Sequence, residues 1–227
     1  MTAELARAGG VLGAAGLAVL IAAPGRLYRL GGLAAWALGI VLLAVYLAPD
    51  GHRPLLAGAA VLGVVLAVAG AAVLKRWPWL LPLVTLACVP ARIHVTVGST
   101  EANLLVPMYG VVAAAAFLLA WELWRGDPRM RELGIAAWPL AAFAAWVGLS
   151  ILWTGDLRQG AIDLLFFYLP FGLLAAALAR LPWDRLWALA LLVELTALAL
   201  VFAAIGLYQY ETRDIFWNPK VSVDNAY

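Results

Sequence analysis

Long uninterrupted runs of apolar residues limit what this sequence can fold into. Eight such runs, each of 15 to 22 residues, cover most of the 227 positions. A helix needs about 20 mostly apolar residues to cross a hydrocarbon core of about 30 Å. Because lipid offers backbone polar groups no partner, each crossing must be a helix or part of a closed barrel. The runs are continuous and rich in Ala and Leu, without the alternation of barrel strands, so they predict helices.

The composition excludes several classes of protein. Hydrophobic residues make up 66% of the chain and charged residues only 12%, whereas a soluble domain is about half apolar and about a quarter charged. Too little polar surface is available for a water-soluble fold. We therefore exclude a soluble globular domain, a disordered tail and a nucleic-acid-binding module, and expect membrane lipids as the main surroundings.

The sequence predicts an all-α, polytopic transmembrane bundle of about eight spans, or seven if the first run does not cross. We expect the spans near residues 8–23, 30–48, 55–74, 77–91, 104–124, 133–153, 161–179 and 186–207. A cleaved signal peptide is the alternative for the first run, but it lacks a good small-residue cleavage pattern and is followed closely by Arg26 and Arg29. Several Trp residues lie near the predicted boundaries, as in the aromatic belt of a membrane interface.

The fourth run carries three prolines, Pro78, Pro82 and Pro90. Proline removes a backbone donor and kinks a helix. This span is expected to be broken or tilted, or to continue to about Val97.

The distribution of Arg and Lys predicts the orientation. The loops after the first, third, fifth and seventh runs hold nine of these residues, and the other loops together with the N-terminus hold four. Basic residues favour the cytoplasmic side. Residues 1–207 are thus predicted to be a transmembrane domain whose loop 125–132 is cytoplasmic, and residues 208–227 an external segment rich in polar and aromatic side chains.

Few residues are candidates for chemistry. The chain has no P-loop, no His-Glu-x-x-His and no Gly-x-Ser-x-Gly motif, and its one Cys and two His residues predict no metal site. Glu194 lies deepest within a span, where it either lines a polar cavity or proton path or is a protonated or paired carboxyl that holds helices together. The same two alternatives apply to Asp163, near the outer end of its span, and the paired carboxyl is favoured because it can reach the interface close to Arg158 and Gln159.

Four stretches resemble the bacterial O-antigen ligase and O-antigen polymerase family. They are RIHVTVGSTEANLL at 92–105, LSILWTGD at 149–156, FFYLPFG at 166–172 and YQYETRDIFWNPK at 208–220. The second is similar to a recurrent S-x-x-W-S/T-x-D boundary, carried here by Ser150, Trp153, Thr154 and Asp156. The likeness extends over roughly residues 77–227.

The resemblance implies transfer of a glycan from a polyprenyl-diphosphate-linked saccharide at the outer face of the bacterial cytoplasmic membrane, with no cofactor, metal or nucleotide sugar. It also implies about a dozen helices and a large external loop with a catalytic histidine. The sequence ends at Tyr227, before that half of the family pattern, and His52 and His94 do not match the histidine. We therefore expect the N-terminal portion of such a protein, with its catalytic residue unassigned and no glycan transfer by this chain alone.

Within this reading, Arg213 is the candidate for donor binding. Its guanidinium can grip a diphosphate at two points, and Lys220 can add a point charge. Tyr210 and Trp217 can pack against the first sugar. The alternative is that Arg213 pairs with a neighbouring carboxylate or with anionic lipid.

Two other functions stay open. A non-enzymatic multi-pass protein, such as a lipid-linked glycan transporter or a scaffold for envelope biosynthesis proteins, has the same composition. A solute transporter predicts broken helices in two matching halves, whereas only the fourth run is a broken candidate here.

Overall fold

The computed structural model describes residues 2–48, 53–91, 93–97, 100–126 and 133–212. The chain divides into two units, Met1–Pro182 and Trp183–Tyr227. The first is a helical bundle with a short β-hairpin. The described part of the second contains one long helix, α9 (Arg185–Thr212).

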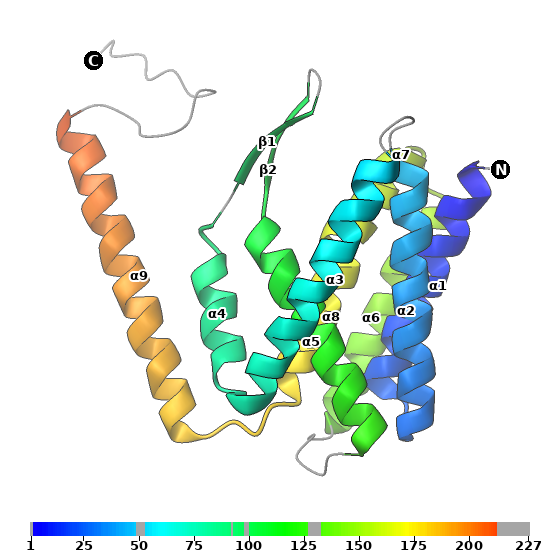
Figure 1. Cartoon of the computed structure of the whole chain (residues 1–227), viewed down its shortest axis with the longest axis horizontal. Helices are drawn as coiled ribbons and strands as arrows, with labels where there is room; N and C mark the ends of the chain where they lie inside the picture. The colour runs from blue at the N-terminus through cyan, green and yellow to red at the C-terminus, as the bar shows by residue number, and fades with distance from the viewer. Residues whose placement is uncertain (1, 49–52, 92, 98–99, 127–132, 213–227) are drawn as a thin grey trace. The chain divides into compact units, whose positions relative to one another are not determined.

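The bundle is built almost entirely from helices (Figure 1). Its elements in chain order are α1 (Thr2–Ala22), α2 (Arg26–Leu47), α3 (Arg53–Arg76), α4 (Leu80–Cys88), β1 (Ile93–Val97), β2 (Thr100–Leu104), α5 (Val106–Arg125), α6 (Ala137–Leu149), α7 (Leu157–Asp163) and α8 (Leu169–Ala179). Short 3-10 turns, Gly134–Ala136 and Ser150–Leu152, extend α6 at both ends, and a π-helical segment, Leu164–Tyr168, joins α7 to α8.

Six helical stretches in the described part of the chain are long and apolar enough to cross a membrane. They are Ala3–Ala22, Arg26–Leu47, Val106–Arg125, Gly134–Leu152, Leu157–Ala179 and Arg185–Thr212. The predicted helical bundle is therefore confirmed. Every predicted span contains a helix, but α4 has only 9 residues, about 14 Å at 1.5 Å per residue, so the count of eight crossings stays a prediction.

The segment after α4 differs from the all-helical expectation. The helix does not continue to Val97; β1 and β2 instead pair antiparallel, with Ile93 opposite Leu104 and Val97 opposite Thr100. Pro90 cannot continue a hydrogen-bonded helix, and alternating β-branched residues follow it. A Gly-Ser pair separates the two strands in the sequence, a spacing typical of a hairpin.

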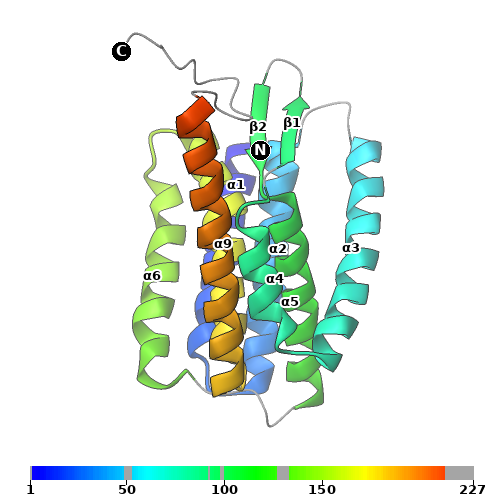
Figure 2. The same ribbon diagram turned by 90° about the vertical axis from the view of Figure 1, so that its left-hand side faces the viewer.

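Successive helices of the bundle run in opposite directions, with α7 and α8 forming one continuous stretch, so the connections fall at two ends (Figure 1). The N-terminus of α1, the hairpin and the α6–α7 connection lie at one end, as Figure 2 also shows for the hairpin. The α1–α2 and α3–α4 connections and the C-terminal end of α5 lie at the other. The helix ends that border the two loop sets distinguished by their Arg and Lys content therefore lie at opposite ends of this unit, which is the arrangement that the orientation prediction requires.

Glycines let α1 and α2 approach closely. A Cβ built on Gly39 of α2 would overlap the Cα of Gly13 in α1, and one on Gly32 would lie 2.7 Å from the carbonyl oxygen of Gly16. Small residues at such a seam bring helix backbones together where lipid provides no hydrophobic drive. Helices α6 and α8 also pack on α1.

Two buried arginines complete the C-terminal end of α1. Arg180, at the end of α8, donates from Nη2 to the carbonyl oxygens of Leu20 (2.8 Å) and Ile21 (3.2 Å). Arg29 donates from Nε to the oxygen of Ala23 at 2.7 Å. The last carbonyls of a helix lack intrahelical partners and carry partial negative charge, so cations there stabilise it. These two arginines thus fasten α2 and α8 to the end of α1.

Candidate functional site

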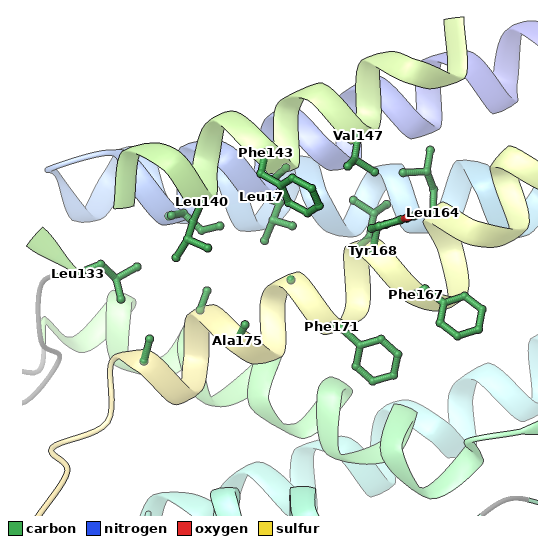
Figure 3. Close-up of a pocket in the computed structure, with 16 residues that line it drawn as sticks. Leu17, Leu133, Leu140, Phe143, Val147, Leu164, Phe167, Tyr168, Phe171 and Ala175 are labelled. Atoms are coloured by element: carbon green, nitrogen blue, oxygen red, sulfur yellow. The ribbon is translucent and has the colours of Figure 1, made fainter. Parts of the chain in front are cut away.

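An apolar groove runs along the bundle between α6 and α8. Its volume is about 370 Å³, and its floor includes Leu17 of α1. Figure 3 shows Leu140 and Phe143 of α6 facing Tyr168 and Ala175 across it. The remaining lining is Ile21, Leu133, Ala144, Val147, Leu164, Phe167, Leu169, Phe171, Gly172, Ala176 and Ala179.

The groove is long as well as apolar. Along the π segment and α8 its lining extends from Leu164 to Ala179, about 20 Å at 1.5 Å per residue. That is about two thirds of a hydrocarbon core of about 30 Å. A groove of this length and character suits an extended hydrocarbon chain.

A polar pocket of about 410 Å³ lies at the α6–α7 connection. Asp156 caps α7 by accepting a hydrogen bond from the backbone N–H of Gln159 at 2.9 Å, and the Gln159 side chain donates to Oδ1 of Asp163 at 2.8 Å. Ser150 and Thr154 add their hydroxyl groups to the lining. Both hydroxyls donate to the backbone, Ser150 to the carbonyl of Val147 at 2.6 Å and Thr154 to that of Asp156 at 3.2 Å. The pocket therefore presents carboxylate and hydroxyl oxygens with spare acceptor capacity.

The groove and the pocket are adjacent. Val147, Leu164 and Tyr168 line both of them. Tyr168 is about half exposed, at 47%, and its ring meets Phe143 edge-on at a centroid distance of 6.5 Å. Its amphipathic side chain, apolar in the ring and polar at the hydroxyl, thus stands where the apolar lining changes to a polar one.

The helical hydrogen-bond pattern is interrupted between the pocket and the groove, at the π segment and Pro170. Pro170 has no N–H to donate to the carbonyl of Phe166, four residues earlier. The hydroxyl of Tyr109, on α5, donates to that carbonyl at 3.1 Å. Trp36, on α2, donates from its indole N–H to the carbonyl of Leu169 at 3.0 Å. Two neighbouring helices therefore supply side-chain donors where the regular α pattern is interrupted.

The sequence-predicted site residues fall in different places. Asp163 lies in the polar pocket and accepts from Gln159. Glu194 lies in α9, half-buried, and its Oε2 has no hydrogen-bond partner among the described residues. Tyr210 is in the last turn of α9 and 80% exposed. Arg213, Trp217 and Lys220 lie outside the described residues.

Sequence reasoning did not assign the pocket as a site. The sequence of 149–156 indicates only a family resemblance, whereas the structure shows that its Ser150, Thr154 and Asp156 line the pocket. An available signal was the Asp156-x-x-Gln159 spacing, which resembles a helix cap, directly after an apolar run. In the part of the chain that the structure describes, no group of three or more His, Cys, Asp or Glu side chains is placed to hold a metal ion.

Comparisons with protein-family models, with curated proteins and with solved structures give no match to this chain.

Proposed function

We propose that this chain binds a lipid-linked saccharide, as the N-terminal portion of an O-antigen-ligase-like protein that transfers a glycan from a polyprenyl-diphosphate carrier. The transfer would take place at the outer face of the bacterial cytoplasmic membrane. The observation that supports the proposal is the adjacency of a long apolar groove and a polar pocket, since such a ligand has one long apolar chain and a polar head. The pocket is also built on the stretch that resembles the family boundary motif.

The chemistry of the pocket suits sugar hydroxyls better than phosphate. Asp156 and Asp163 carry carboxylates that accept hydrogen bonds from hydroxyl groups, whereas they would repel a diphosphate. Arg158, exposed on the first turn of α7, is the nearest cation in sequence and can pair with a phosphate at the rim. Arg213 and Lys220 stay our proposed contacts to the diphosphate, and Tyr210 and Trp217 to the first sugar.

A binding measurement tests the groove. Full-length chain in nanodiscs would be titrated with a fluorescent polyprenyl-diphosphate disaccharide. Ala175→Trp fills the groove, and Ala142→Trp places the same ring on an exposed position of α6 outside it. We expect the first variant to weaken binding at least tenfold and the second to leave it unchanged. Wild-type affinity in a folded Ala175→Trp protein would contradict the assignment.

A second variant tests the polar pocket. Asp163→Asn removes an anionic acceptor while keeping the shape of the side chain. We expect it to weaken binding of the disaccharide-bearing lipid severalfold and to leave polyprenyl phosphate without sugar unaffected. An equal effect on both lipids would contradict the proposal that the sugar binds in the pocket.

Glycan-transfer assays distinguish a glycan-transferring enzyme from a protein that only binds or transports the lipid-linked glycan. A lipid-linked glycan transporter needs the same ligand but forms no glycosidic bond. We expect no transfer by this chain alone, because proton abstraction from an acceptor requires a positioned base and none is assigned. Turnover by the purified chain would overturn this expectation. In an active longer protein, Arg213→Lys keeps the charge but loses the two-point contact, so a large loss of activity is expected.

A further inference from the structure

Trp121 of α5 is contacted by two cations at the end of the bundle opposite the polar pocket. Lys75, in the last turn of α3, places Nζ 4.4 Å from the centre of the indole ring. Arg125, one turn after Trp121, places its guanidinium carbon 4.9 Å from the same centre. The two positive charges are thus within about 9 Å of each other, about one Debye length at physiological salt, so they repel.

Further charges surround this pair. Arg76 stacks over Trp77 at 5.4 Å, and Nη1 of Arg26 lies 2.9 Å from the position that a Cβ on Gly126 would take. The half-buried Glu122 is the one carboxylate in the last turn of α5. In the part of the chain that the structure describes, no carboxylate lies within ion-pair distance of Lys75 or Arg125. The described residues at this end therefore carry a clear excess of positive charge.

An apolar strip leads from the two cations toward the middle of the helix. Phe117, Trp121 and Trp124 are spaced three and four residues apart on α5, so they share one face. They are 38%, 46% and 75% exposed. A ligand for the cations thus meets an apolar surface directly beside them.

From this geometry we infer a binding site for one anionic phospholipid at the ends of α3 and α5. The phosphodiester lies between Lys75 and Arg125 beside Trp121, and an acyl chain follows the strip toward Phe117. The negative charge of the phosphodiester offsets the repulsion between the two cations. The apolar strip beside them provides a surface on which an acyl chain can pack, so the site favours a phospholipid over a free anion. The site is separate from the groove and does not depend on the proposed function.

The test measures binding of acyl-labelled phosphatidylglycerol to the full chain in non-ionic detergent micelles. Lys75→Gln with Arg125→Gln removes the two cations from exposed positions. The control is Arg7→Gln, which removes one exposed cation at the other end. We expect the double variant to weaken binding about fivefold per cation and the control to change it less than twofold.

Two further arms identify the ligand. Acyl-labelled phosphatidylcholine should bind at least tenfold more weakly than phosphatidylglycerol, and inorganic phosphate at equal concentration should not compete. Equal losses per cation in the double variant and in Arg7→Gln would show general attraction without a site, and effective competition by inorganic phosphate would show a free-anion site. Either result overturns the inference.

Discussion

The hydrogen bond from Tyr109 to the carbonyl of Phe166 provides a quantitative test of the interrupted helix. Tyr109→Phe removes the hydroxyl and keeps the ring, whose centre lies 5.9 Å from that of Phe166 and 6.5 Å from that of Phe171. A hydrogen bond between membrane helices contributes about 0.6 kcal/mol on average and up to about 1.7 kcal/mol. A carbonyl that loses a donor in an apolar setting costs about 1–3 kcal/mol. We expect Tyr109→Phe to lower the free energy of unfolding by about 1 kcal/mol.

Pro170→Ala supplies the matched background for this measurement. Alanine restores an N–H that can reach the carbonyl of Phe166, so the Tyr109 hydroxyl becomes dispensable. In the Pro170→Ala protein, Tyr109→Phe should therefore cost less than about 0.3 kcal/mol, giving a coupling energy of about 1 kcal/mol. Equilibrium unfolding of the four proteins in mixed micelles, followed by circular dichroism, measures this quantity. Additive effects of the two substitutions would refute the idea that Tyr109 compensates for the proline.

Two further predictions concern the helix seam and the orientation. Gly39→Ala should destabilise the bundle by about 2 kcal/mol or more, because the new methyl group overlaps α1. Gly31→Ala, in the same helix but with nothing within 4 Å of the new Cβ, should change the stability by less than about 0.5 kcal/mol. Thermal unfolding of both variants measures the difference, and equal effects would contradict the close approach of α1 and α2. In a chain lacking Cys88, an impermeant thiol reagent applied to intact cells should label a cysteine replacing Val223 and leave one replacing Met130 unlabelled, and the opposite pattern would reverse the predicted orientation.

Hydropathy was sufficient to locate the helices. Lipid forces the backbone into helices wherever apolar runs are long, so the eight runs and the eight helical regions coincide. It was less informative about the fourth run, where Pro82 lies inside α4 and Pro90 just after it. The hairpin that follows depends on the alternation of Ile93, Val95 and Val97, which is a weaker signal than a long apolar run.

The candidate site could be predicted only in part. Asp163 stood out because a carboxyl within an apolar run is rare, and it does line the polar pocket. The groove left no mark in the sequence, because Leu140 and Ala175 resemble any lipid-facing residues. Which apolar residues line a groove depends on how α6 and α8 pack against α1, and that packing is a long-range property.

The π segment between α7 and α8 also fixes the rotation of one helix relative to the other. A π turn accommodates one extra residue within an α-helix, and each residue of a regular α-helix turns the chain by about 100°. If Leu164–Tyr168 took up regular α-helical hydrogen bonding with no residue removed, α7 would turn by roughly that angle relative to α8. Asp163 would then leave α6 while Ala175 kept its place on the groove. A change in backbone conformation that preserves every side chain would in this way separate the pocket from the groove.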